Sequence, residues 1–255
     1  MNSEQDYNKM GWLYNALYGD MSAEALKDLY YIKDHKELLN SYQKDNVVIL
    51  DSACGNGVQA TALALNGYNL VATDISSEMI ALTNDFSAKH GVKLKTEVKS
   101  WIDLPDKYSN NFDIVFCTGN SIVHSSDAIS RQDNLTALSK LLKPKGTLVI
   151  ETRNWDKVIA ENKKYTAYDK ISYNGKDYIP LYQWNLHDVE QEAKIEILLQ
   201  EISSDNKVTI YPSELSFTPF THDSLIEMIR KLNLKITRDN FDMENDWYFV
   251  YGKIE

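Results

Sequence analysis

The chain has 255 residues, of which 43% are hydrophobic and 25% charged, with only 10 Gly and 5 Pro. This composition excludes disordered, collagen-like and disulfide-scaffold proteins, and it predicts one large domain or one domain with an inserted subdomain. The 27 Lys and Arg against 37 Asp and Glu give a net charge of −10. Binding to a phosphate backbone would lack its usual driving force, so we expect no nucleic-acid partner.

The sequence carries no readable membrane or export signal. Its longest apolar runs, such as Val47–Leu50 and Thr147–Ile150, are far shorter than the roughly 20 residues that cross a bilayer. Residues 1–20 have no basic region ahead of an apolar stretch. Cys54 and Cys117 are too few for a disulfide framework and are expected to be buried thiols. We therefore expect a cytoplasmic protein without a membrane partner, and we predict no metal site.

From residue 46, short β-branched runs alternate with helical patterns, which is typical of a parallel sheet wrapped by helices. The expected strands are Asn46–Leu50, Asn69–Thr73, Leu94–Val98, Phe112–Cys117 and Gly146–Glu151. The expected helices are Val58–Leu65, a second from Ser76 or Ser77 to Lys89, and Asn134–Leu142. Residues 46–156 therefore form the predicted ligand-binding core, and residues 1–45 are expected to add one or two helices before it.

Beyond Asp156 the hydrophobic period changes to two, which indicates an antiparallel insert over residues 157–220. Its expected strands lie near Asp169–Tyr173, Tyr178–His187, Glu192–Ile202 and Val208–Phe217, with a hairpin turn at Asn174-Gly175. In residues 221–255 we predict a helix from Thr221 or Asp223 to Leu232, then strands Leu234–Arg238 and Trp247–Tyr251. The predicted fold is α/β, with a mostly parallel seven-stranded sheet and an antiparallel insert after its fifth strand.

The segment Ile49–Gly57 reads as a strand that runs into a tight glycine turn and opens a helix. Without a Cβ atom, Gly55 and Gly57 allow backbone amides to approach a ligand, and ligands bind at the carboxyl ends of such strands. Asp74 ends the second predicted strand, where its carboxylate can accept both hydroxyls of an adenosine ribose. The plainer alternative is a turn that only permits helix–strand packing, with Asp74 capping the next helix.

The glycine pattern alone does not select a cofactor, because Gly55–Ala60 also satisfies the dinucleotide fingerprint. Two features favour S-adenosylmethionine over a nicotinamide dinucleotide. Asp51 precedes the turn, and the chain has a single mononucleotide-type half closed by a final strand pair.

Three segments carry a resemblance to a known family. They are Leu50–Val58 (LDSACGNGV), Phe112–His124 (FDIVFCTGNSIVH) and Leu142–Asp156 (LKPKGTLVIETRNWD). In them the chain resembles the class I methyltransferases, and within these the glycine and glycine/sarcosine N-methyltransferases, strongly over residues 46–156 and weakly on either side. The resemblance implies a Rossmann-like core that binds S-adenosylmethionine and releases S-adenosylhomocysteine.

The resemblance also implies the residues that hold the methyl donor. These are Asp51, Ala53, Gly55, Gly57, Asp74, Ile75, Ser100, Trp101 and Cys117. Trp101 matches the residue that stacks on adenine, with core packing as the alternative. Asp103 or Ser100 would bond the adenine amino group, although the family has an amide side chain where Ser100 stands.

For the methyl acceptor, the resemblance implies three residues. Arg153 would hold a carboxylate, for which its guanidinium fork is suited; the alternative is a surface pair with Glu151 or Asp156. Asn120 would accept from the acceptor's amine through its side-chain carbonyl, or else cap its own turn. Tyr18 would approach the sulfonium and orient the amine as the second catalytic residue.

Three further features concern the surroundings of this site. His124 is expected to be a structural hydrogen-bonding residue. Where the family places an Arg for the donor carboxylate, residues 21–40 contain only Lys27, Lys33 and Lys36. Trp12 and Tyr14 are expected to line the pocket or to pack in the core.

The antiparallel insert resembles the lid that covers the acceptor in this family. It is rich in aromatic residues, among them Tyr165, Tyr168, Tyr173, Tyr178, Tyr182 and Trp184. Phe217 and Thr218 stand where the family often has tyrosines, which predicts a less polar wall at the far end of the acceptor.

The predicted function is therefore S-adenosylmethionine-dependent methyl transfer to the amine of a small carboxylate-bearing metabolite such as glycine or sarcosine. Two alternatives stay open: N- or O-methylation of an amino sugar or other natural product, and a protein that binds the donor without catalysis. The sequence is also compatible with a homo-oligomer.

Overall fold

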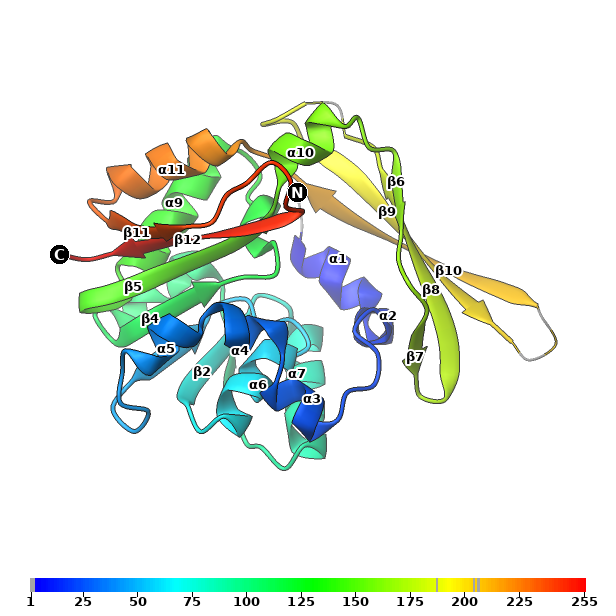
Figure 1. Cartoon of the computed structure of the whole chain (residues 1–255), viewed down its shortest axis with the longest axis horizontal. Helices are drawn as coiled ribbons and strands as arrows, with labels where there is room; N and C mark the ends of the chain where they lie inside the picture. Colours follow the sequence, from blue (N-terminus) through cyan, green and yellow to red (C-terminus); the bar gives the residue numbers. More distant parts are fainter. Residues whose placement is uncertain (1–2, 187, 204, 206) are drawn as a thin grey trace.

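A seven-stranded sheet of order β11-β12-β5-β4-β1-β2-β3 forms the larger half of the molecule in the computed structural model, which describes residues 3–186, 188–203, 205 and 207–255 (Figure 1). Its strands are β1 Val48–Asp51, β2 Asn69–Asp74, β3 Lys95–Val98, β4 Phe112–Cys117, β5 Leu142–Arg153, β11 Lys235–Asp239 and β12 Trp247–Lys253. Strands β1 to β5 pair in parallel, whereas β12 runs antiparallel to both β5 and β11. The predicted α/β fold is confirmed.

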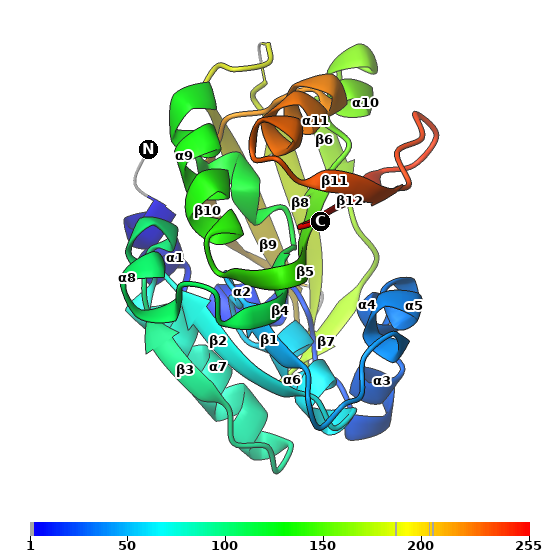
Figure 2. The same cartoon turned by 90° about the vertical axis from the view of Figure 1, so that its left-hand side faces the viewer.

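Helices cover both faces of this sheet, which explains why its central strands are apolar on both sides. One face carries α6 Val58–Leu65 and α7 Ser77–Lys89 together with α3 Ala23–Lys27, α4 Tyr30–Asp34 and α5 Lys36–Asn40 (Figure 2). The other carries α8 Pro105–Tyr108, α9 Ala128–Ser139 and α11 His222–Lys231. The chain changes faces between β1 and β4, and ligands bind at such a switch point.

Several predicted boundaries need correction. Helix α9 begins at Ala128, six residues earlier than predicted, because the Asp127 carboxylate caps it by accepting from the Ser130 amide at 2.7 Å. Strand β5 begins at Leu142, because a register shift against β4 accommodates Pro144 and the positive φ of Lys145.

The prediction of one or two helices before the sheet was wrong. The structure has α1 Ser3–Met10 and α2 Trp12–Ala16, followed by α3, α4 and α5. Gly11 and Gly19 adopt φ of 51° and 73°, which ends a helix at each point. Ser22 then starts α3 afresh, accepting from the Ala25 amide.

The insert forms a second, antiparallel sheet beside the core, with α1 and α2 between the two (Figure 1). Its strands are β6 Tyr165–Ala167, β7 Ile171–Tyr173, β8 Lys176–Trp184, β9 Ala193–Ile202 and β10 Val208–Phe217, and α10 Trp155–Ala160 leads into it from β5. The predicted hairpin turn at Asn174-Gly175 is confirmed by the pairing of Tyr173 with Lys176. Strand β6 was not predicted, and His187 lies outside the described residues.

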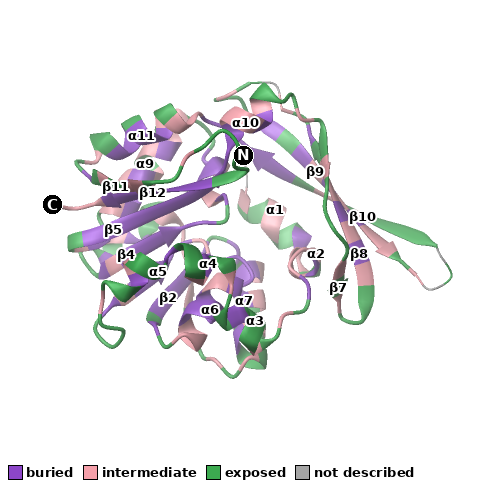
Figure 3. Cartoon of the chain, viewed as in Figure 1, coloured by how far each residue is buried: buried purple, intermediate pink, exposed green. Residues whose placement is uncertain are grey.

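Alternate residues of β9 face the core and are buried (Figure 3). They are Ala193, Ile195, Ile197 and Leu199. The far end of β10 extends beyond the core and is largely exposed (Figure 3). The antiparallel sheet therefore offers one apolar face to the space around α1 and α2.

A buried arginine ties this sheet to the core. Arg131 on α9 donates through Nη1 to both carboxylate oxygens of Glu190, at 2.8 and 3.0 Å, and through Nη2 to the Thr218 carbonyl at 2.9 Å. Its guanidinium also lies 4.3 Å from the centre of the Phe220 ring. Glu190 lies between β8 and β9, and Thr218 follows β10, so one side chain secures two loops of the insert.

None of the helices among the residues that the structure describes is long and apolar enough to span a bilayer. Nor do these residues include a group of three or more His, Cys, Asp or Glu side chains that could hold a metal ion.

Candidate active site

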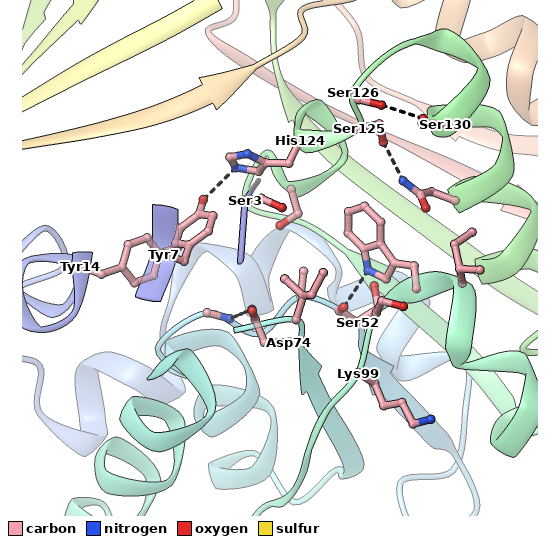
Figure 4. Close-up of a pocket in the computed structure, with 18 residues that line it drawn as sticks. Ser3, Tyr7, Tyr14, Ser52, Asp74, Lys99, His124, Ser125, Ser126 and Ser130 are labelled. Atoms are coloured by element: carbon pink, nitrogen blue, oxygen red, sulfur yellow. Dashed lines mark hydrogen bonds between the residues drawn. The ribbon is translucent and has the colours of Figure 1, made fainter. Parts of the chain in front are cut away.

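The glycine turn after β1 forms part of the first of two adjoining cavities, which has a volume of about 340 Å³ (Figure 4). Gly55 lines it with φ 55°, and a Cβ atom there would lie 3.0 Å from the Tyr14 ring. The Gly55 amide donates to Oδ2 of Asp74 at 2.9 Å, and the Ser76 amide donates to Oδ1 at the same distance. The turn and the end of β2 are thus held together by one carboxylate.

Asp74 keeps capacity to accept further hydrogen bonds, because each oxygen has a second lone pair. Burial raises the pKa of its carboxyl to about 6, partly offset by the amides that it accepts. The alternative that Asp74 serves only to cap α7 fails, since Ser76 is the cap and accepts from the Met79 amide at 3.1 Å. Asp74 is placed to receive a hydroxyl pair.

Two residues predicted to contact the donor have other surroundings. A Cβ atom at Gly57 would lie 2.8–2.9 Å from Thr83, so this glycine permits α6 and α7 to pack together. Cys117 is fully buried in the hydrophobic core, where burial raises the pKa of its thiol to about 12. Like Asp51, neither residue lines the first or the second cavity, and the contacts of all three with the donor stay predictions.

Asp51 is a buried carboxylate that accepts no hydrogen bond of good geometry from the described residues. It is 0% exposed, and neither oxygen meets a donor in good geometry. Burial raises the pKa of this carboxyl to about 7, partly offset by the nearby Ala53 amide. Asp51 thus lies at the start of the turn, behind the residues that line the cavities.

Asp51→Asn is expected to raise the melting temperature of the ligand-free protein at pH 8. The folded pKa of about 7 exceeds the ordinary 3.8, so the stability that Asp51 contributes is full below pH 4 and lost as pH rises through 7. Removing the buried charge should recover about 1 kcal/mol or more, or roughly 2 °C, and flatten the pH dependence. Thermal denaturation from pH 4 to pH 8 measures both. Asp113→Asn, which breaks a 2.7 Å pair with Lys143, is the control and should not stabilise; a lower melting temperature for Asp51→Asn would contradict the prediction.

Trp101 forms one wall of the first cavity together with Ala53 and Ile75. Its indole Nε1 donates to the Ser52 carbonyl at 2.8 Å, which fixes the ring beside the glycine turn. Ser100 and Asp103 bond to each other at 2.5 Å on the same side. The half-buried ring packs against the hydrophobic core and also lines the cavity, so core packing and stacking on a ligand are compatible here.

The second cavity, of about 240 Å³, lies between the end of β5, the N-terminal helices and the antiparallel sheet. Arg153 lines it and is only 9% exposed. Its guanidinium lies 5.0 Å from the Trp184 ring and 4.7 Å from the Trp247 ring, and Nη2 donates to the Tyr168 hydroxyl at 2.9 Å.

No carboxylate of the described residues forms an ion pair with Arg153. The alternative of a pair with Glu151 or Asp156 was wrong: Glu151 accepts from the Gly119 amide, and Asp156 accepts from the His222 amide. A buried cation is costly without a counter-charge. The second cavity is therefore suited to an anion.

Asn120 lines the second cavity, but its side-chain oxygen is already used. It accepts from Thr152 Oγ1 at 2.9 Å and from the Arg153 amide at 3.1 Å. With both lone pairs engaged, this oxygen does not receive an acceptor's amine as predicted. Asn120 instead fixes the backbone that carries Arg153.

Tyr7, Tyr14 and His124 line both cavities. His124 Nδ1 lies 3.0 Å from the Ser216 carbonyl, which can only accept, so Nδ1 carries the proton and Nε2 accepts from the Tyr7 hydroxyl at 2.8 Å (Figure 4). Burial lowers the pKa of His124 to about 4, which keeps the ring neutral. Tyr7 was missed from the sequence, where it is one aromatic residue in a polar helix.

Tyr18 lines the second cavity, and its hydroxyl lies 3.3 Å from that of Tyr14. Burial raises the pKa of Tyr18, so its phenol stays neutral and acts by hydrogen bonding. Trp12 lines neither cavity and packs instead against Tyr178 and Tyr211.

The lysines that could replace the family's arginine are not near the site. Lys27, Lys33 and Lys36 are exposed, and Lys33 pairs with Asp28 at 2.7 Å. A small hollow next to the glycine turn is lined instead by neutral side chains, among them Gln59 and Thr118, which are bonded at 2.8 Å.

Three of the aromatic residues of the insert line the second cavity: Tyr168, Tyr182 and Trp184. Tyr165 is exposed, and Tyr173 and Tyr178 do not line this cavity. Phe217 contributes to its wall as predicted, but Thr218 is buried and donates to the Ser126 carbonyl. Trp247, the second indole at Arg153, was predicted only as part of a strand.

A family model described as a methyltransferase domain matches residues 43–206. Among curated relatives, a glycine/sarcosine N-methyltransferase of Halorhodospira halochloris is 32% identical over 111 residues, covering 44% of this chain and 41% of the relative. The human glycine N-methyltransferase is 30% identical over 125 residues, covering 44% and 42%. The chain thus spans less than half the length of these relatives.

Solved structures share the whole fold. An S-adenosylmethionine-dependent methyltransferase from Clostridium acetobutylicum superposes with a TM-score of 0.71 at 17% identity, covering 97% of this chain and 98% of the other. An amino pentose methyltransferase from Micromonospora echinaspora, in a structure with the donor bound, gives 0.71 at 14% identity, covering 95% and 97%.

Proposed function

The chain belongs to the methyltransferase domain family, and from this premise we propose that it transfers a methyl group from S-adenosylmethionine to the amine of a small carboxylate-bearing metabolite. The observation that carries the acceptor class is Arg153, a buried guanidinium in the second cavity with no ion pair among the described residues. Glycine and sarcosine, which the relatives' names contain, are the first acceptors to test.

The residues of the first cavity fit the donor. Asp74 would receive the two ribose hydroxyls, and Trp101 would stack on the adenine beside Ala53 and Ile75. The amino-acid end would lie in the hollow near Gln59 and Thr118. The buried acid Asp51 lies outside the lining of this hollow, two residues before Ala53, and would offset the charge of an ammonium group there. When bound, S-adenosylmethionine supplies an electrophilic methyl group, whose carbon bonds to the acceptor nitrogen as the sulfonium keeps the electron pair.

The protein's own contribution is to place the acceptor. Arg153 would bind the carboxylate, while the hydroxyls of Tyr18 and Tyr14 lie where the cavities adjoin and can accept from the amine's N–H. These phenols are neutral, so the amine reacts as the free base and the product releases its extra proton to water. Fixing the reactants in line can contribute about 7–11 kcal/mol to lowering the barrier.

The test combines calorimetry with a product assay. S-Adenosylmethionine is titrated into the protein, and S-adenosylhomocysteine release is then measured with glycine, sarcosine, dimethylglycine, glycinamide and amino sugars. Turnover confined to carboxylate-bearing amines supports the proposal. Turnover of amino sugars or glycinamide alone would favour the natural-product alternative, and donor binding without product would favour the non-catalytic one.

A further inference from the structure

The face of the antiparallel sheet that lines the second cavity is a regular grid of side chains. Alternate residues of a strand share a face, so Pro180, Tyr182 and Trp184 of β8 point the same way. In the next strand, Ile197 pairs with Tyr182 and Ile195 pairs with Trp184; in the third strand, Leu215 pairs with Ile195. Most of these residues line the cavity.

Arg153 lies at one end of this grid, because its guanidinium packs on Trp184. Pro180, which also lines the cavity, is four residues away along β8, or about 13 Å at the usual rise per residue. In glycine a single carbon joins the amine to the carboxylate. With its carboxylate on Arg153, glycine would leave most of this length unfilled.

The unfilled part has an apolar wall. Toward the end far from Arg153, the cavity is lined by Ile197, which pairs with Tyr182, and by Pro180, Ile171 and Leu17. Its 240 Å³ is many times the ~10–15 Å³ that one water molecule needs. Water held against such a wall is unfavourable, whereas an apolar group there would gain the free energy of burial.

Resting on the proposed function, we infer that the acceptor is an α-amino acid with an apolar side chain, and that glycine is a poor substrate. Its carboxylate binds Arg153, its amine faces Tyr18, and its side chain lies on Ile197, Pro180 and Ile171, which together form the apolar floor. The α-carbon carries all three groups, so a single acceptor can reach all three surfaces at once.

The first experiment compares kcat/KM for glycine, alanine, valine, leucine and phenylalanine, with asparagine as a polar control of the same size as leucine. We expect leucine to exceed both glycine and asparagine by at least about 10-fold, since one methylene in an apolar pocket is worth roughly 10-fold or more. A preference for glycine or asparagine overturns this inference while the proposed function stands. Failure of every carboxylate-bearing amine overturns the proposed function itself.

The second experiment places a larger side chain on the apolar floor. Ile197→Phe should reduce the ratio of kcat/KM for leucine to that for glycine by at least about 10-fold, since its larger ring occupies the side-chain space. Ile179→Phe is the matched control: Ile179 lies on the other face of β8 and does not line the cavity. An equal fall in both variants overturns the inference. Calorimetric binding of the donor checks that each variant is folded, and the wild-type comparison decides alone if Ile197→Phe does not fold.

Discussion

Arg153→Lys is expected to reduce kcat/KM for a carboxylate-bearing acceptor by about 10²–10³-fold, because a guanidinium–carboxylate pair makes two charge-assisted hydrogen bonds of about 1.5–3 kcal/mol each. A lysine ammonium is a compact, strongly hydrated charge that cannot form this fork. It also cannot lie flat between the indoles of Trp184 and Trp247 as the guanidinium does. Only kcat/KM for the acceptor should fall, and the affinity for the donor should stay unchanged.

Steady-state kinetics with an amino acid and its amide measure this effect, alongside donor binding by calorimetry. Arg131→Lys is the control, because Arg131 is equally buried but is paired with Glu190 away from both cavities. It should lower the melting temperature and leave the acceptor KM unchanged. If Arg153→Lys lowered turnover of the amino acid and its amide equally, the carboxylate role would be wrong.

Asp74→Asn is expected to weaken donor binding by about 10–100-fold, the loss of one to two hydrogen bonds to a charged group. Both oxygens of Asp74 accept from amides, those of Gly55 and Ser76, so an asparagine amide would point an N–H at another N–H. One of the two hydrogen bonds, from Gly55 or from Ser76, would then be lost. Calorimetric titration at pH 8 gives the change in dissociation constant.

The same carboxyl makes donor affinity depend on pH. Burial raises the pKa of Asp74 to about 6, so the charged acceptor form dominates above pH 6 and is lost below it. Wild-type affinity should fall as pH drops from 7 to 5, and Asp74→Asn should show a smaller fall, because Asp51, with a pKa of about 7, still loses its charge over this range. Asp113→Asn, at the opposite end of the sheet, should behave like wild type; a fall of the same size in Asp74→Asn would assign the titration to another group.

The parts of the fold that sequence predicted best are those with strong local signals. Helices α6 and α7 begin and end near the predicted residues because the glycine turn, Ser76 and Gly91 mark their ends. The N-terminal helices and β6 are only three to eight residues long, and elements so short form through packing against the rest of the protein. Their number could not be predicted from periodicity.

The site was predictable in its residue types and less so in its contacts. Arg153 was identified from the family resemblance of Leu142–Asp156, but its partners Trp184 and Trp247 come from distant parts of the chain and meet it only in the folded protein. Gly55 and Gly57 belong to one motif, yet the first faces the cavity and the second faces Thr83. Spacing alone does not distinguish the two.

The attachment of the antiparallel sheet through Arg131 limits how acceptor preference can be redesigned. A chimera that takes residues 157–220 from a relative would change the side chains that line the second cavity and leave the glycine turn, Asp74 and Trp101 of the first cavity unchanged. The graft must also supply a carboxylate for Arg131 where Glu190 stands, and an indole for Arg153 where Trp184 stands. Without that carboxylate, the guanidinium of Arg131 would be buried without a counter-charge. Without that indole, the guanidinium of Arg153 would lose one of the two aromatic rings on which it packs.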